Sequence, residues 1–500
     1  MSRPPRSADL VPPTVAETDW RSLLFGDDSS PATQAEVAAR LSRADLGRWL
    51  SQVQQVRRCA RPVRLVGSSD RIDGSTGEVV ASYTSTSEPD GVTYLRCGNR
   101  RASVCPSCSY EYKGDLWHVL MAGAAGGIKG VPDTVAAHPL VFASFTAPSF
   151  GQVHAAKKPG RPGTRRCLPR TGDRRQLCPH GRPRWCMSVH DHTDPACGQP
   201  LCSDCYDYTA HLIWQWWAPE LWRRFTITLR RRIANYLGLS EAAARERVRV
   251  QFAKVAEFQR RGIIHFHALI RLDGTPTDTQ PYPGPVVDLD SGVLAGLVRS
   301  AATAISYDAQ PIDGDDIRRR LRFGTQLDAR PVTGTADRDT HGSQLHPETV
   351  AAYIAKYATK AAADLPTDSH AGDRHLLRLK TTVGQLARRA VLADLRGAVS
   401  PYKGWDRWAD MLGFRGHFAT KSHRYSTTLG RLRQVRRDYT RRHHRAETPS
   451  AGQLDLADSD EQVEEDSTLV LGSWRFAGMG WLTTGDAALA MASAARARDD

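Results

Sequence analysis

The chain has 500 residues, 40% of them hydrophobic, and a formal net charge of +14. This length exceeds what one hydrophobic core supports, so two to four domains are expected. No apolar run could span a bilayer and no signal-type stretch opens the chain, which excludes an integral membrane protein and predicts a cytoplasmic one. The positive charge favours an anionic partner, with nucleic acid ahead of a membrane surface.

Composition and pattern divide the chain into five regions. The first contains a predicted helical pair at residues 32–56 and a predicted loop at residues 67–78. The last opens with residues 447–466, where eight acidic and no basic residues predict disorder. In order, the regions are a peripheral segment (1–95), a cysteine-rich segment (96–215), a core of strands and helices (216–365), a basic helical segment (366–445), and an acidic linker and tail (446–500).

The central elements predict an α+β fold. Alternation and β-branched residues indicate strands, and apolar residues at helical spacing indicate helices. This succession favours a palm with a central antiparallel sheet and flanking helices. In chain order we expect a strand at 138–150, a helix at 219–239, strands at 247–258 and 263–272, a helix at 292–306, a strand near 319–328 and a helix at 347–363.

The sequence RRGIIHFHALIRL places His265 and His267 on one face of a strand. Residues 260–262 fit a three-residue hairpin loop that ends in a left-handed glycine. In that register Glu257 lies opposite His265 and becomes the predicted third metal ligand, with Gln259 as the alternative. Such a site suits Mg²⁺ or Mn²⁺. The other interpretation is two structural histidines on a half-buried strand.

The predicted helix at 347–363 carries Tyr353 and Tyr357, which share a face because they are four residues apart. Together with the metal ligands, a tyrosine that attacks a phosphate would equip an enzyme that nicks and joins DNA. Lys356 would lower a phenol pKa, contact phosphate or simply be solvated. The alternative for both tyrosines is a helix face that packs on the sheet.

The ten cysteines are expected to be reduced or metal-bound. Two C-x-x-C pairs, Cys105 with Cys108 and Cys202 with Cys205, predict one structural zinc site. A second predicted zinc site uses Cys178, His180, Cys186 and His190, and Cys97 could replace any of these ligands. Cys59 is interpreted as a core residue, whereas Cys167 and Cys197 stay unassigned.

Two segments are strongly basic. Residues 157–184 carry ten Lys or Arg, and residues 421–445 carry nine with a single Asp. Such segments could follow the phosphates of DNA, although a solvated charged face is the alternative. The tryptophans of residues 405–418 are expected to pack rather than to stack on bases.

The motifs HFH (265–267) and YIAKY (353–357), in this order, resemble those of the HUH endonucleases, and specifically of rolling-circle replication initiators. YIAKYATK is similar to the two-tyrosine helix of phage gene A-type initiators. CGNRRASVCPSCS, EFQRRGIIHFHALIRLDG and LGFRGHFATKSHRYS resemble RepSA-type initiators of actinobacterial plasmids and integrative elements. The resemblance covers about residues 95–430. FASFTAPS (142–149) would be the family's first motif, although FTITL (225–229) matches it as well.

This resemblance implies an HUH palm in which His265 and His267 bind the metal and Tyr353 or Tyr357 attacks the DNA. The implied products are a 5′-phosphotyrosine and a 3′-OH that primes a host polymerase. No Walker motif occurs, so a host helicase would unwind the origin. Two other functions stay open, a two-tyrosine HUH transposase and a non-catalytic zinc-containing DNA-binding regulator.

Overall fold

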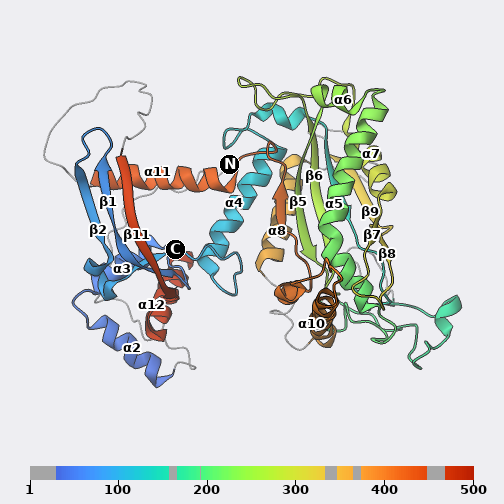
Figure 1. Cartoon of the computed structure of the whole chain (residues 1–500), viewed down its shortest axis with the longest axis horizontal. Helices are drawn as coiled ribbons and strands as arrows, with labels where there is room; N and C mark the ends of the chain where they lie inside the picture. Colours follow the sequence, from blue (N-terminus) through green and yellow to red (C-terminus); the bar gives the residue numbers. More distant parts are fainter. Residues whose placement is uncertain are drawn as a thin grey trace. The chain divides into compact units, whose positions relative to one another are not determined.

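The computed structural model describes residues 30–156, 166–191, 193–332, 346–363, 373–447 and 468–499. The chain forms two compact units (Figure 1), one of residues 1–110 and 452–500 and the other of residues 111–451. Both contain helices and antiparallel strand pairs, which confirms the α+β class. The acidic residues 448–466, expected to be disordered, lie outside the described residues.

The first unit joins the two ends of the sequence in one sheet. Strand β11 (Thr468–Met479) pairs with β1 (Val63–Asp73) along its whole length, and β2 (Val79–Thr84) and β3 (Thr93–Leu95) also pair with β1. In Figure 1, β2, β1 and β11 lie side by side. The prediction of a loop at residues 67–78 is therefore wrong for residues 67–73, because a strand distant in sequence supplies their hydrogen bonds.

Helices pack against one end of this sheet and share its core, whereas much of the rest of the sheet is exposed. Two of them, α2 (Pro31–Leu41) and α3 (Leu46–Gln55), confirm the predicted helical pair. The third, α12 (Thr484–Asp499), follows β11. Trp49 of α3 is fully buried beside Trp481, with ring centroids 5.4 Å apart. The short helices of this unit are η2 (Ser85–Ser87) and η3 (Pro89–Gly91).

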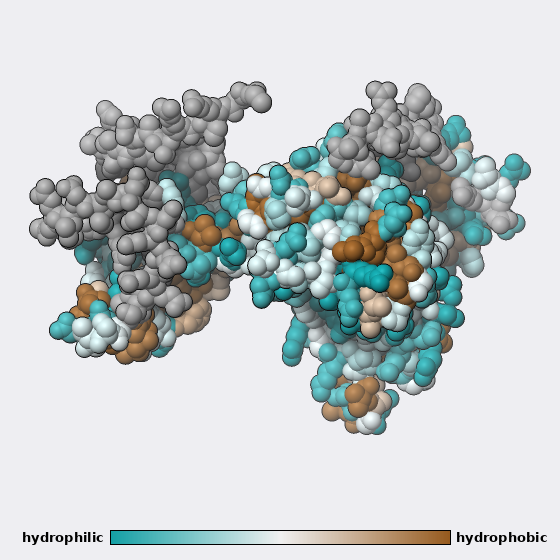
Figure 2. Space-filling view, turned by 90° about the horizontal axis from the view of Figure 1, so that it is seen from above, coloured by the Kyte–Doolittle hydropathy of each residue, from teal (hydrophilic) through white to brown (hydrophobic). Residues whose placement is uncertain are grey.

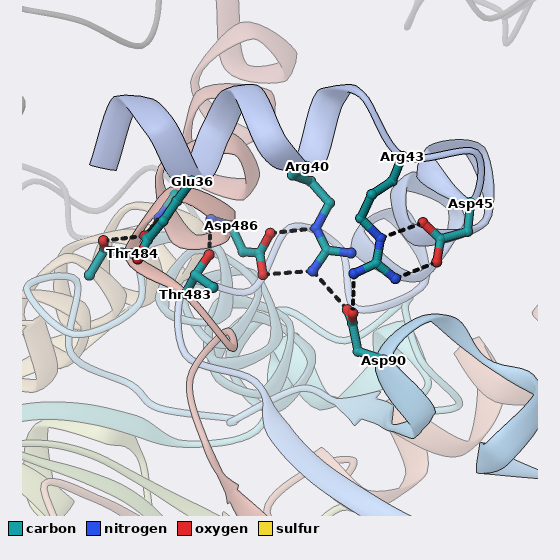
Figure 3. Close-up of polar contacts among 9 residues, drawn as sticks. Glu36, Arg40, Arg43, Asp45, Asp90, Thr483, Thr484 and Asp486 are labelled. Carbon is teal, nitrogen blue, oxygen red and sulfur yellow. Dashed lines mark hydrogen bonds and ion pairs between the residues drawn. The ribbon is translucent and has the colours of Figure 1, made fainter. Parts of the chain in front are cut away.

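A buried ion-pair network fastens α12 to α2 (Figure 3). The guanidinium of Arg40 donates to both carboxylate oxygens of Asp486, at 2.7 and 2.9 Å, and to Asp90 at 2.7 Å. The Oε2 atom of Glu36 accepts a hydrogen bond from the backbone N–H of Gly485, at 2.8 Å, in the first turn of α12. Because Arg40 and Asp486 are almost completely buried, each neutralises a charge that water does not reach.

The second unit contains a five-stranded antiparallel sheet. Its order is β10 (Ala419–Lys421), β5 (Arg249–Phe258), β6 (Ile264–Asp273), β4 (Leu140–Phe145) and β9 (Leu327–Val332). Strands β4 and β10 thus come from outside residues 216–365. A separate pair consists of β7 (Tyr307–Ala309) and β8 (Arg319–Leu321).

The helices of this unit match most of the predicted ones. Of the two segments considered for the first motif, FTITL (225–229) lies inside helix α5, whereas FASFTAPS (142–149) begins within strand β4. Trp405 of η6 is fully buried, so the tryptophan segment packs as predicted. The elements are α4 (Pro106–Ala124), η4 (Asp133–Ala137), η5 (Gly172–Arg175), α5 (Tyr208–Tyr236), α6 (Glu241–Arg247), α7 (Ser291–Ala304), α8 (Pro347–Ala363), α10 (Arg374–Leu395), η6 (Trp405–Met411) and α11 (Leu429–Glu447).

The sheet buries both of its faces, because successive side chains of β6 point in opposite directions. Phe266 and Ile270 join the core formed with α5, α7 and α10, whereas Leu269 joins the core that contains Ile354 of α8. Figure 1 shows α8 and α5 on opposite sides of β5 and β6. His265 and His267 are four and two residues before Leu269 in β6, so their side chains point to the same face of the sheet, which is the α8 face.

No helix of the described residues combines the length and apolar character that a bilayer crossing requires. On the face drawn in Figure 2, hydrophobic residues form patches that are separated by hydrophilic ones.

Replacement of Asp486 by Asn tests the importance of the buried network. We expect Asp486→Asn to destabilise the first unit by about 3 kcal/mol, because it leaves the buried charge of Arg40 only partly neutralised. Asp328→Asn, which removes a carboxylate from an exposed pair with Arg330, should cost less than about 1 kcal/mol. Urea unfolding and hydrogen exchange of α12 measure the difference. Equal costs for the two variants would contradict the role of the network.

Candidate active site and cysteine clusters

The hairpin between β5 and β6 has the predicted register. Glu257 lies opposite His265, and the backbone N–H of Gln259 donates to the carbonyl of Ile263 at 2.8 Å. Gly262 has a φ of 75°, and a Cβ there would come within 2.8 Å of side-chain atoms of Leu376 and Leu379. Glycine is therefore required both for the turn and for the close packing of α10.

Glu257, His265 and His267 form a cluster with the geometry of a metal site. Oε2 of Glu257 lies 2.8 Å from Nε2 of His265 and 3.4 Å from Nε2 of His267. One ligand atom from each residue lies within 4.8 Å of the others. Two imidazoles and a carboxylate leave further coordination positions open, so these residues fit a divalent cation that also contacts a substrate.

Charge and hydrogen bonding favour the forms of these side chains that bind metals. Burial raises the pKa of Glu257, but its contacts with His265 and His267 outweigh burial and leave the pKa below its usual value. Burial lowers the pKa of His267 more than Glu257 raises it. A charged carboxylate and a neutral imidazole therefore coexist at neutral pH, as metal coordination requires.

Ser144 of β4 orients His267, and the sequence patterns did not reveal it. Ser144 pairs with His267 across the sheet, and its Oγ lies 2.8 Å from Nδ1 of the imidazole. When Nδ1–H donates to Ser144, the lone pair of Nε2 points to the cluster. Only the pairing of β4 with β6, more than 120 residues apart in sequence, places this serine.

Gln259, the alternative third ligand, contacts the other side of His265. Its Nε2 lies 3.4 Å from Nδ1 of His265, whereas Glu257 lies beside Nε2 of the same ring. Its Oε1 accepts a hydrogen bond from Arg261 at 2.9 Å. The geometry therefore favours Glu257 as the ligand and Gln259 as a residue that supports the ring.

Helix α8 brings Tyr353 to the cluster. The helix begins at Pro347, a favourable first residue, and buries Ile354 against the sheet. The ring centroid of Tyr353 lies 5.8 Å from that of His267, and Phe142 contacts both rings. With 42% of its surface exposed, Tyr353 is accessible to a large substrate beside the cluster.

The two remaining residues predicted on α8 are less completely described. Lys356 is exposed. Tyr357 belongs to α8 by its backbone, one turn after Tyr353, but its side chain lies outside the described residues.

The first cysteine cluster consists of Cys59, Cys97, Cys105 and Cys108. Sγ of Cys59 lies 3.7 Å from that of Cys105 and from that of Cys108, and the Sγ atoms of Cys97 and Cys108 are also 3.7 Å apart. A tetrahedron with Zn–S distances of about 2.3 Å has edges of about 3.8 Å. These four sulfurs therefore have the spacing of a structural zinc site.

A second cluster contains Cys178, His180, Cys202 and Cys205. Nδ1 of His180 lies 3.3 Å from Sγ of Cys205 and 3.7 Å from Sγ of Cys202. Burial raises the pKa of Cys178, but hydrogen bonds from backbone N–H groups and neighbouring thiols lower it to about 7. A substantial thiolate fraction at neutral pH favours metal binding.

A third cluster contains His154, Cys167, Cys186 and His190. Nε2 of His190 lies 3.3 Å from Sγ of Cys186 and 3.2 Å from Nδ1 of His154. Nδ1 of His190 lies 2.6 Å from Oδ2 of Asp194, which directs Nε2 toward the cluster. This carboxylate–histidine arrangement is typical of zinc sites.

The predicted pairing of the cysteines is therefore wrong. The two C-x-x-C pairs belong to different clusters, and residues 178–190 divide between two clusters. Cys59 was interpreted as core and Cys167 was unassigned, yet each lies in a cluster, whereas Cys197 lies in none among the described residues. The spacing predicted the wrong grouping because a C-x-x-C pair supplies two of the four zinc ligands and does not indicate which residues supply the other two.

Comparison with known proteins identifies the family. The family model described as "RepSA: Replication initiator protein, pSAM2" matches residues 45–495. A curated replication initiator protein from Streptomyces ambofaciens is 40% identical over 465 residues, which cover 92% of each chain. The chain belongs to the RepSA replication initiator family. The RepSA match includes parts of both units and all four clusters. No solved structure matches the chain.

The three cysteine clusters predict the metal content of this RepSA-family protein. We expect the purified full-length chain to carry three zinc ions and Cys59→Ser and Cys186→Ser each to carry one fewer, because each removes a ligand from a different cluster. Mass spectrometry under non-denaturing conditions counts the ions. Cys197→Ser is the matched control and should retain all three. An equal loss in this control, or a chain without zinc, would argue against the assignment.

Proposed function

We propose that this RepSA-family initiator nicks and rejoins a DNA strand at a replication origin through a tyrosine on α8. The observation that carries the proposal is the position of Tyr353, whose ring lies beside His267 and is accessible from solvent. A nucleophile, a carboxylate and two imidazoles thus converge on the same face of one sheet. Family membership favours this function over a transposase or a non-catalytic regulator.

The chemistry follows from what each residue can do. Glu257, His265 and His267 would hold Mg²⁺ or Mn²⁺, which when bound would withdraw charge from a phosphate oxygen and orient the phosphate. The phenolate oxygen of Tyr353 then forms a bond to phosphorus as the bond to the 3′-oxygen breaks, and the 3′-oxygen takes up a proton. The products are a 5′-phosphotyrosine and a free 3′-OH. Because the new bond conserves the phosphodiester energy, rejoining requires no ATP.

Tyr357 and Lys356 complete the proposal. A second tyrosine one turn further along α8 would perform a second transfer, in which one tyrosine holds DNA while the other cuts. Lys356 would contact a phosphate near the reacting bond. A host polymerase would extend the 3′-OH and a host helicase would open the duplex.

We further propose that the second unit is an HUH palm. Its histidine pair lies on β6, the middle strand of five, and the tyrosine helix α8 packs on the same face. The cysteine clusters would hold structural zinc outside this palm. They would stabilise segments with few regular elements, such as residues 166–191 and 193–205, which contain mainly isolated bridges.

Covalent capture tests the nucleophile. We expect the purified chain with Mn²⁺ to become attached to a single-stranded oligonucleotide from the origin, because the phosphotyrosine is stable to denaturation. Tyr353→Phe should reduce the adduct by at least about 100-fold, and Tyr353→Phe/Tyr357→Phe should abolish it. Denaturing gels measure the fraction attached.

Tyr236→Phe, which removes the hydroxyl of an exposed tyrosine at the end of α5, is the control and should behave like the unchanged chain. An adduct that persists in the double variant would contradict both tyrosine assignments.

The hydrogen bond from His267 to Ser144 gives a further prediction. We expect Ser144→Ala to weaken Mn²⁺ binding by about 10- to 100-fold, because the imidazole loses the partner that sets its tautomer and orientation. Isothermal titration with Mn²⁺ measures the affinity. Ser149→Ala, near the end of the same segment but bonded only to the backbone of residue 151, should leave it unchanged. The hypothesis fails if Ser144→Ala binds Mn²⁺ as tightly as this control.

A further inference from the structure

A cavity of about 620 Å³ lies at the opposite end of β5 from Glu257. Its wall contains four arginines from separate segments, defined here as the arginine pocket: Arg230 on α5, Arg245 on α6, Arg249 at the start of β5 and Arg424 after β10. The pocket forms where the short strand β10 ends, so that among the described residues the start of β5 has no neighbouring strand on that edge.

The charges of the arginine pocket have no paired counter-charge in the part of the chain that the structure describes. Within the described residues, no carboxylate forms an ion pair with any of the four arginines, and the buried Nε of Arg249 has no hydrogen-bond partner. Glu241 also lines the pocket, but it pairs with Arg231 at 3.1 Å. Like charges held together without a counter-ion are costly, so this arrangement suits an anionic ligand.

Burial and the neighbouring arginines both affect the pKa of Arg230. Its pKa lies below the usual value because the pocket wall removes part of its hydration and because Arg245 and Arg249 add like charge. An anion in the pocket would reverse the second effect.

A backbone donor of β5 completes the wall, whereas the donors of Ser422 are used within the protein. Ser422 closes the edge of β5 at Phe252, donating its N–H to the Phe252 carbonyl at 2.8 Å and accepting the Phe252 N–H on Oγ at 2.9 Å. Because backbone groups alternate along an antiparallel strand, the N–H of Val250, two residues earlier, points to the same edge. Oxygen atoms of an anion would therefore meet a backbone donor as well as guanidinium groups.

We propose that the arginine pocket binds the backbone phosphates of DNA at a contact separate from the metal and tyrosine site. Four guanidinium groups match several phosphates better than one small anion. Among the described residues, the lining includes no Phe, Tyr or Trp, and its one aromatic side chain is His423, so a free nucleotide would find only a small ring on which to stack its base. The phosphate chain, rather than the base, is the part of the ligand that this wall recognises.

The position of the pocket relates it to the proposed reaction. Arg249 precedes Glu257 by eight residues of one strand, a span of about 26 Å at about 3.3 Å per residue. One DNA strand advances by about 3.4 Å per nucleotide. The span of β5 thus corresponds to about eight nucleotides, and a DNA that contacts both sites needs at least this length, because the pocket is lined from the α5 side of the strand and Glu257 lies on the α8 side. This minimum spacing rests on the proposed nicking function, whereas phosphate binding by the pocket does not.

The experiment measures DNA binding by the full-length, zinc-loaded chain in buffer without Mg²⁺, Mn²⁺ or a chelator, so that no cleavage takes part and the cysteine clusters keep their metal. The variant is Arg245→Gln/Arg424→Gln, in which both side chains are exposed and the core is untouched. We expect it to bind a 30-base-pair duplex about tenfold more weakly and to lower the slope of log affinity against log salt by about 2, because each phosphate contact contributes about 0.9. Thermal unfolding checks the fold, and Arg424→Gln alone, with a slope change of about 1, serves if the double variant folds poorly.

The control is Arg223→Gln/Arg330→Gln, which removes the same charge from two exposed arginines that already pair with Glu220 and Asp328. Equal losses in the two double variants, or no loss in the pocket variant, would overturn the proposal. The proposal would also be overturned if free dATP at micromolar concentration displaced the duplex, because the pocket would then bind a nucleotide. If the chain forms no adduct with Mn²⁺ but the pocket variant still binds DNA more weakly than the control variant, the nicking mechanism is contradicted and the arginine pocket stays supported.

Discussion

The register of β5 against β6 is the constraint on which the candidate site depends. Glu257 reaches the two histidines only because it lies directly opposite His265. A slip by one residue would turn Glu257 toward the α5 face, where a carboxylate would be buried among apolar side chains at a large cost. Phe266 and Ile270 oppose the same slip, because it would move them out of that core. Gly262 allows the tight turn that this register requires.

The same sheet separates two kinds of chemistry along its length. One end of the hairpin collects Glu257 and the histidines, with Tyr353 above them, and the other end collects arginines. At the first end, Ser144 of β4 contacts His267. At the second end, β10 is too short to pair with the first residues of β5, and the arginine pocket lies there. Because a strand is nearly inextensible, the distance between Glu257 and Arg249 is set by the number of residues between them.

The first unit depends on contacts between the two ends of the sequence. Strand β11 completes the sheet of β1, and Arg40 is neutralised mainly by Asp486, which lies 446 residues later. Cys59 shares its cluster with Cys97 and the first C-x-x-C pair. A metal in this cluster would join Cys59, which precedes β1 in the sequence, to three cysteines that follow β3. Its binding free energy would then contribute to folding.

Local pattern determined the helix of the two tyrosines, the helical pair at residues 32–56 and the hairpin with Glu257 opposite His265. These features follow from periodicity and from one glycine turn, which act over a few residues. Only the tertiary structure decided the role of Ser144, the grouping of cysteines such as Cys59 and Cys167, the pairing of β1 with β11 and the arginine pocket. Each of these joins residues far apart in sequence, and no local periodicity records which distant segments will meet.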